Sequence, residues 1–398
     1  MSTPERDVLL VGAFERDNFG DSLFLLATER LLGPRCLAAS VVSSDMTEVL
    51  GRRVVSYDSA LTLAPWRLVW VVGGEIGGVT VADALPMSLP DGLGDDYEAL
   101  SPDDRSRYDS YVSGLDDGAP AYLPELDRYP LNDRTPLVVA SVGLTGGLVD
   151  GGSVLGTREA AALGRATVVS VREHESERVA AALGVPTRLS PDLVHALPLL
   201  FPETFPEGAG RPAERTETRR GSLVFQMNRG MLDEAGTSAL ALELAEAARE
   251  QEAGVLLFPA GTARHHDSPE QYVALREEMR AVAPDVEVQI VETRGPLELA
   301  RVIGDAVCWV GSSLHGRIVS SALGVPRVSL QVDKVTRYAA TWPDGMPSDV
   351  PVDGIVVAVR AAVAAAASDE QLLVDRSLTE RALANARAIT DEVLRDVL

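Results

Sequence analysis

One short segment, residues 311–317 with the sequence Gly-Ser-Ser-Leu-His-Gly-Arg, holds the residue types best suited to chemistry. It lies between a predicted apolar strand, residues 306–310, and a predicted apolar helix that begins near Ile318. The N–H groups at a helix N-terminus, with the hydroxyls of Ser312 and Ser313, can bind an anion. His315 can exchange a proton near neutral pH. The segment predicts an anion site with a general acid or base, and a purely structural His315 is the alternative.

A second candidate, residues 12–21, joins the first predicted strand to the first predicted helix and contains Asn18, Gly20 and Asp21. Gly20 would let a ligand approach the backbone, and Asn18 and Asp21 could bind a sugar hydroxyl. Both side chains could instead only cap the helix. The glycine spacing is not that of the dinucleotide-binding fingerprint.

Paired glycines follow two later strands. Gly73 and Gly74 come directly after the apolar run 68–72, and residues 141–147 repeat the arrangement after another strand. Such glycines can admit a ligand to the backbone or simply reverse the chain. If the two turns are neighbours along one sheet edge, that edge is expected to face a ligand.

Two arginines end predicted strands, where a guanidinium could bind a carboxylate or phosphate with two parallel hydrogen bonds. Arg172 is the stronger candidate, and a salt bridge to Glu173 or Asp192 is its alternative role. Arg229 holds the corresponding place in the second half of the chain.

His265, His266 and Asp267 follow the predicted strand 255–259, a combination that suggests a metal site. Adjacent histidines point in different directions and no further ligand has a spacing typical of zinc, so no metal site is expected. The loop could contact a ligand through His266 or be a plain surface loop.

The elements that must position these residues alternate between short apolar strands and amphipathic helices, which predicts an α/β fold with parallel sheets. We expect two Rossmann-like doubly wound domains: residues 1–200, with an acidic insertion at about 80–135, and residues 221–398, which end in helices. Residues 201–220 are rich in Pro, Gly and charge and predict a linker. The insertion could be a lid or an acceptor-recognition element, or it could be a surface loop or an oligomer contact.

Composition narrows the classes of partner. The 398 residues are 46% hydrophobic and 24% charged, as in a soluble globular protein. The net charge of -23 disfavours nucleic acid and anionic membrane surfaces. No apolar run approaches the length needed to span a bilayer, so we expect no stable membrane insertion. Only Cys36 and Cys308 occur, so we expect no disulfide framework and a cytoplasmic location. The charge does not exclude a phosphorylated ligand, and a homo-oligomer is compatible with the sequence.

The ordered set of motifs resembles the polysaccharide pyruvyl transferase family. The resemblance is carried by residues 18–21 (Asn-Phe-Gly-Asp), 72–74 (Val-Gly-Gly), 170–172 (Ser-Val-Arg), 191–192 (Pro-Asp), 313–316 (Ser-Leu-His-Gly) and 324–326 (Gly-Val-Pro), followed by Lys334. Members resemble two-domain glycosyltransferases of the GT-B type, with two facing domains. Characterised members transfer pyruvate from phosphoenolpyruvate to two sugar hydroxyls as a ketal.

The resemblance implies roles for the candidate residues. His315 would be the general acid, with Arg172 and Asp21 also catalytic. The donor would be bound by Ser312, Ser313, Gly316, Arg317, Arg229 and Lys334, and the acceptor by Asn18, Gly20, Gly73, Gly74 and His266. Many members have Arg two residues before this His, where this chain has Ser313, so Arg317 or Arg229 would have to supply the missing cation.

Three functional hypotheses follow. The first is a pyruvyl transferase that uses phosphoenolpyruvate as co-substrate, requires no cofactor and acts on a carbohydrate or other small hydroxyl-bearing acceptor. The second is a GT-B glycosyltransferase with a nucleotide-sugar donor. The third is a non-catalytic relative that binds a glycan or a protein. Fold analogy alone does not choose among them.

Overall fold

The computed structural model describes residues 7–144, 154–206, 221–264 and 266–397. They form two compact units: unit 1 comprises Met1–Leu193 and Ala382–Leu398, and unit 2 comprises Val194–Arg381. The unit boundary thus lies just before the predicted one at 201–220, and the end of the chain belongs to unit 1 rather than to the second domain. Two contacts join the end of the chain to the rest of unit 1. Arg188 and Glu392 form an ion pair at 2.5 Å, and the Asn385 amide donates to the Ser170 hydroxyl.

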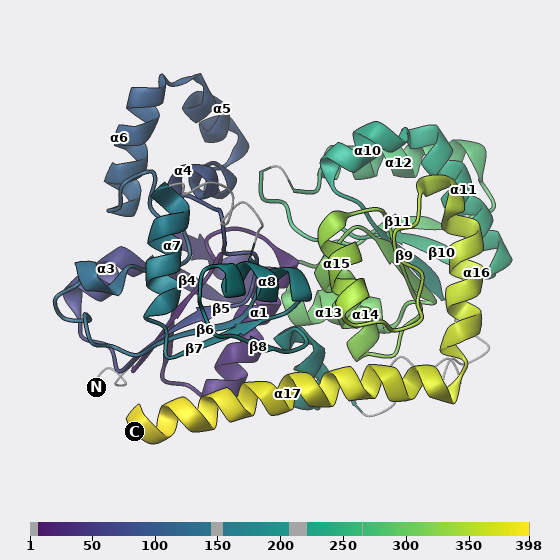
Figure 1. The fold of residues 1–398 in the computed structure, drawn as a ribbon. Coiled ribbons are helices and arrows are strands. Elements are labelled where there is room, and N and C mark those ends of the chain that lie inside the picture. The colour runs from purple at the N-terminus through teal and green to yellow at the C-terminus, as the bar shows by residue number, and fades with distance from the viewer. Residues whose placement is uncertain (1–6, 145–153, 207–220, 265, 398) are drawn as a thin grey trace. The chain divides into compact units, whose positions relative to one another are not determined.

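Unit 1 is built on an eight-stranded sheet in the order β3-β4-β2-β1-β5-β6-β7-β8, parallel except for the antiparallel β3–β4 pair. Its central strands are continuous apolar runs because both faces are covered by helices (Figure 1), and β5 and β6 are buried throughout. The strands are β1 (Val8–Val11), β2 (Cys36–Ser40), β3 (Ser44–Met46), β4 (Arg52–Ser56), β5 (Leu68–Val72), β6 (Leu137–Val142), β7 (Val168–Val171) and β8 (Arg188–Leu189).

The helices of unit 1 fall into two groups. One group connects the strands: α1 (Phe19–Leu32), α2 (Thr47–Leu50), α3 (Tyr57–Leu63), α7 (Val154–Gly164) and α8 (His174–Ala182). The other group lies within the acidic insertion, where α4 (Val81–Ala84), α5 (Asp91–Ala99) and α6 (Pro102–Ser113) form a helical lobe with the short 3-10 turn η1 (Leu85–Ser88) (Figure 1). A second 3-10 turn, η2, spans Leu126–Arg128. The insertion is folded, and its Tyr97, Tyr122 and Tyr129 are buried.

Unit 2 holds a five-stranded, fully parallel sheet in the order β11-β10-β9-β12-β13. The strands are β9 (Ser222–Gln226), β10 (Gly254–Leu257), β11 (Val288–Ile290), β12 (Cys308–Gly311) and β13 (Arg327–Ser329). The helices are α9 (Leu197–Leu200), α10 (Arg229–Ala235), α11 (Thr237–Glu250), α12 (Pro269–Val282), α13 (Pro296–Gly304), α14 (Leu314–Ala322), α15 (Asp333–Thr341) and α16 (Ile355–Ala366), with 3-10 turns η4 (Leu193–Ala196) and η6 (Val352–Gly354). The last helix, α17 (Asp369–Val397), begins in unit 2 and ends in unit 1.

Both units therefore have the predicted doubly wound α/β architecture. In such folds ligands bind at the carboxyl ends of the strands. All the candidate residues follow strand ends in the order that the sequence predicts. Among the described residues, no helix combines the length and the apolar character needed to cross a membrane.

Candidate functional sites at the carboxyl ends of both sheets

The turn between β1 and α1 begins the candidate site of unit 1. Asn18 is the N-cap of α1, and its side-chain oxygen accepts from the N–H groups of Gly20 at 2.9 Å and Asp21 at 3.2 Å. Asn18 and Gly20 are thus hydrogen-bonded to each other, as expected if Asn18 only caps the helix. The Asp21 carboxylate extends beyond the cap, and it lies 3.9 Å from the guanidinium of Arg16. Of these three predicted residues, only Asp21 presents a charged group outside the helix cap.

The glycine turn after β5 lies next to the turn between β1 and α1. Gly73 and Gly74 have φ values of 44° and 79°, a conformation that side chains other than glycine rarely adopt. A Cβ at Gly73 would lie 2.3 Å from the Phe24 ring, and one at Gly74 would lie 3.4 Å from the Asp21 carboxylate. The Asp21 turn and the glycine turn are therefore in contact. The two glycine turns, which we expected to be neighbours along one sheet edge, also meet, because the Gly143 N–H donates to the Gly74 carbonyl at 2.8 Å. Thr145, Gly146 and Gly147 of the later turn lie outside the described residues.

Arg172 follows β7 and is only 2% exposed. Its guanidinium pairs with the carboxylates of Glu75 at 2.8 Å, Glu173 at 3.2 Å and Asp192 at 3.8 Å. The salt-bridge alternative thus describes what the structure shows. One arginine among three carboxylates leaves the group with negative charge, which suits hydroxyl groups better than anions.

Sequence reasoning missed several polar residues of this edge. Glu15 accepts from the hydroxyls of Tyr122 at 2.8 Å and of Ser40, and Arg16 bonds to both Glu15 and Tyr122. Tyr122 belongs to the acidic insertion, so the insertion contributes directly to the β1–α1 turn. Glu15 and Arg16 could have been found from the sequence, because they lie inside the 12–21 motif. Their contact with Tyr122 could not, because no local pattern links residues so far apart in the chain.

Glu75 and Glu159 were also missed. Glu75 follows Gly74, its side chain is 29% exposed, and its Oε1 has no hydrogen-bond partner among the described residues. Glu159 on α7 is fully buried and accepts from the Gly78 N–H at 2.9 Å. Burial raises the pKa of Glu159 to about 7, while the hydrogen bond from Gly78 opposes that shift.

In unit 2 the β12–α14 turn carries the candidate acid. Ser313 is the N-cap of α14 and accepts from the Gly316 N–H at 3.2 Å. His315 lies in the first helical turn and is half-buried. Gly316 packs against Trp309, since a Cβ there would lie 2.0 Å from the indole ring. The turn is preorganised, but the Ser313 oxygen and the Gly316 N–H bond to each other.

Ser312 also faces inward. It is 3% exposed, and its N–H and hydroxyl both donate to the side-chain oxygen of Gln226 at 3.2 Å. The Ser312 hydroxyl already donates its proton to Gln226. The surroundings of Ser312 therefore give little support to its predicted role in binding the donor substrate.

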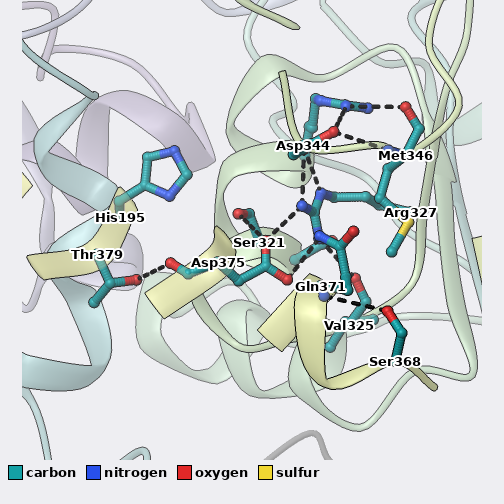
Figure 2. Close-up of polar contacts among 12 residues, drawn as sticks. His195, Ser321, Val325, Arg327, Asp344, Met346, Ser368, Gln371, Asp375 and Thr379 are labelled. Atoms are coloured by element: carbon teal, nitrogen blue, oxygen red, sulfur yellow. Dashed lines mark hydrogen bonds and ion pairs between the residues drawn. The ribbon is translucent and has the colours of Figure 1, made fainter. Parts of the chain in front are cut away.

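The predicted role of Arg317 in donor binding is not what the structure shows. We expected Arg317 to compensate for the absence of Arg at position 313, but it is 2% exposed and donates to Asp344 at 2.5 Å and to Ser329 at 3.0 Å. Asp344 also pairs with Arg327 at 2.8 Å, and Arg327 in turn pairs with Asp375 at 2.6 Å (Figure 2). The helical period turns Arg317 away from the start of α14 and into this buried network, so it acts in packing.

The other two predicted donor-site cations, Arg229 and Lys334, lie near Asp267. Arg229 begins α10, is exposed, and its N–H donates to the carbonyl of His266 at 3.2 Å. Lys334 is exposed in the first turn of α15, and its charge is close enough to lower the pKa of Asp267. Arg229, His266 and Lys334 thus border one region around Asp267. His265 lies outside the described residues.

Sequence reasoning considered Asp267 only as part of a metal site and gave Gln226 no role. Asp267 is 8% exposed and accepts from the Gln226 amide at 3.0 Å, the Ala260 N–H at 2.7 Å and the Tyr272 hydroxyl at 3.1 Å. Burial raises the pKa of Asp267 to about 6, and these hydrogen bonds oppose the shift. Asp267 was visible beside the histidine pair, but its partnership with Gln226 depends on the sheet.

The two units and their strand-end sites define a GT-B-type α/β protein, and solved structures agree. UDP-GlcNAc 2-epimerase from Neisseria meningitidis, bound to UDP-GlcNAc, has a TM-score of 0.52 at 10% identity, over 98% of this chain and 100% of that chain. The 2-epimerase from Rickettsia bellii gives 0.53 at 11% identity, over 98% and 96%. HepE of Anabaena in complex with UDP-glucose gives 0.52 at 11% identity, over 98% and 99%. These likenesses show the fold.

The family is shown by sequence. The polysaccharide pyruvyl transferase family model matches residues 18–334, and the chain belongs to this family. The resemblance carried by the ordered motifs is thereby confirmed, and so is membership of a transferase family. No curated protein sequence matches the chain.

Proposed function

We propose that this protein transfers pyruvate from phosphoenolpyruvate to two hydroxyls of a carbohydrate or similar small acceptor, forming a ketal. The observation that carries the proposal is family membership over residues 18–334, which includes the His315 turn. His315 protonates the methylene carbon of the enol and leaves an oxocarbenium-like centre at C2. One acceptor hydroxyl attacks C2, phosphate leaves, and the second hydroxyl closes the ketal, each hydroxyl losing its proton.

The charge distribution supports separate places for the two substrates. A donor with a phosphate and a carboxylate needs cations, and Arg229 and Lys334 are exposed cations near Asp267 in unit 2. An acceptor offers hydroxyls, which donate well to carboxylates such as Asp21 and Glu75 in unit 1. Arg172 then holds the carboxylates of unit 1 in place and is not itself the donor anchor. No metal or other cofactor enters these steps.

Calorimetric titration of phosphoenolpyruvate into the purified protein tests the donor. We expect binding by the wild type, weakened about tenfold by Lys334→Ala or Arg229→Ala because each removes a charged hydrogen-bond donor. His315→Ala should largely keep binding, since its role is in the chemical step. Arg280→Ala, an exposed arginine on α12, is the matched control.

Uridine diphosphate is the comparison ligand, because two of the fold relatives above were solved with UDP-GlcNAc and UDP-glucose. Clear binding of uridine diphosphate without binding of phosphoenolpyruvate would overturn the proposal. It would favour the second hypothesis, a glycosyltransferase that uses a nucleotide-sugar donor.

A further inference from the structure

The side-chain amide of Gln226 links two parts of the donor site in unit 2. Gln226 ends β9 and is 3% exposed. Its Nε2 donates to Asp267 Oδ1 at 3.0 Å, and its Oε1 accepts from the N–H and hydroxyl of Ser312, each at 3.2 Å. The amide therefore has a fixed polarity, with the nitrogen toward Asp267 and the oxygen toward the His315 turn.

The Asp267 carboxylate sets that polarity. An ionised carboxylate only accepts hydrogen bonds. Its Oδ2 takes the Ala260 N–H at 2.7 Å and the Tyr272 hydroxyl at 3.1 Å, and its Oδ1 faces the Gln226 nitrogen. If the Gln226 amide were reversed, its oxygen would face the carboxylate and its nitrogen would face the Ser312 N–H. Both contacts would be repulsive, so the carboxylate holds the amide in one orientation.

The same contacts join three strand-end turns. Ser312 Oγ accepts from the Asn228 N–H at 3.3 Å, and Asn228 is the N-cap of α10. The Arg229 N–H donates to the carbonyl of His266, the residue before Asp267. The turns after β9, β10 and β12 are thus fastened around the Gln226–Asp267 pair, and they carry Arg229, His266 and His315.

We propose that Gln226 and Asp267 are positioning residues of the donor site: Asp267 fixes the orientation of the Gln226 amide, and Gln226 holds the Ser312 turn. That turn presents His315 and, through the hydrogen bond from Asn228 to Ser312, also holds the start of α10 with the donor-binding Arg229. This inference rests on the proposed function. Neither residue touches the donor, and their effect passes through Ser312 and Asn228.

Burial of the Asp267 carboxylate carries a cost in stability. Burial raises the pKa of Asp267 to about 6, against the opposing effects of the Ala260 N–H, the Gln226 amide on β9, the Tyr272 hydroxyl on α12 and the charge of Lys334 on α15. Ionising this group near pH 7 disfavours the folded state, because the folded pKa lies above the ordinary aspartate value.

Exchanging the amide at position 226 and the carboxylate at position 267 tests the inference. Asp267→Asn should weaken phosphoenolpyruvate binding about tenfold, because an amide nitrogen at the Oδ1 position would oppose the Gln226 nitrogen and force Gln226 to reverse. The double variant Gln226→Glu with Asp267→Asn conserves charge and restores every polarity. Its new carboxylate at position 226 would accept from Ser312 and from the new amide nitrogen at position 267, while the amide oxygen at position 267 would accept from Ala260 and Tyr272. We expect its affinity to return to within about threefold of the wild type.

Controls separate positioning from folding. Gln226→Ala should also weaken binding about tenfold, whereas Gln371→Ala, at another buried glutamine of unit 2, should bind as the wild type does. Calorimetry is done well below the unfolding temperature of each variant, so that a difference in stability does not appear as lost affinity. Wild-type affinity in Asp267→Asn or Gln226→Ala, or a folded double variant no better than Asp267→Asn, would overturn the inference. A wild type that does not bind phosphoenolpyruvate overturns the donor assignment itself, and this inference with it.

Discussion

Each unit buries arginine among carboxylates, but the two clusters differ in charge balance and in exposure. In unit 2, Arg317 and Arg327 face Asp344 and Asp375, so two cations match two anions, and all four side chains are at most 6% exposed. In unit 1, Arg172 faces Glu75, Glu173 and Asp192, and the Glu75 side chain is 29% exposed. Balanced and buried charges are typical of packing, whereas the excess of carboxylate in unit 1, with Glu75 partly exposed, leaves acceptors for hydrogen bonds.

The position of each cluster in the sequence gives no sign of this difference. Arg172 and Arg317 both follow strands, and both were predicted as anion binders. Arg317 is buried and packs in the core of unit 2. Arg172 instead pairs with three carboxylates of unit 1. A strand-end arginine is therefore a candidate site residue only after its partners are known.

The largest expected effect lies in the balanced cluster. Asp375→Asn removes one of the two anions that neutralise Arg327, so we expect the free energy of unfolding to fall by about 3 kcal/mol. Urea unfolding followed by circular dichroism measures the change. Glu380→Gln, on the same helix with its side chain 57% exposed, is the control and should change it by less than about 0.5 kcal/mol. A cost at Asp375 as small as at Glu380 would show that the balanced cluster does not stabilise the fold.

An intermediate effect is expected at Glu159, a buried carboxyl of unit 1 that has no arginine partner among the described residues. Its folded pKa of about 7 lies above the ordinary glutamate value, so the folded state retains a proton that the unfolded state has lost. The contribution of Glu159 to stability therefore falls as pH rises from about 4.5 to 7. Glu159→Gln does not ionise and should gain about 1–2 kcal/mol relative to the wild type between pH 5 and pH 8. Urea unfolding of both proteins at the two pH values is the measurement, and an equal difference at both would refute a raised pKa.

The smallest effect is expected in the open cluster. Glu75→Gln is the same carboxylate-to-amide change as Asp375→Asn, but the partly exposed Glu75 is one of three anions around Arg172. The remaining two still neutralise the guanidinium, so the free energy of unfolding should change by less than about 1 kcal/mol. Urea unfolding beside Asp375→Asn gives a direct comparison. A loss as large as that at Asp375 would mean that the two clusters serve the same structural purpose.

The sequence by itself determined the two doubly wound units, the order of their strands along the chain and the family. These follow from apolar runs, helical periodicity and short ordered motifs, all of which are local. It also located the turns after β1, β5, β7, β9 and β12, because turn residues follow strands at recognisable spacings.

Only the tertiary structure decided which polar atoms in those turns remain available. Asn18 and Ser313 became helix caps, Ser312 and Arg317 turned inward, and the end of the chain joined unit 1. The residues that complete the sites come from distant segments: Tyr122 lies 107 positions from Glu15, and Ser312 lies 86 from Gln226. Parallel sheets bring strand ends together regardless of separation along the chain, so these partnerships have no local signal to read.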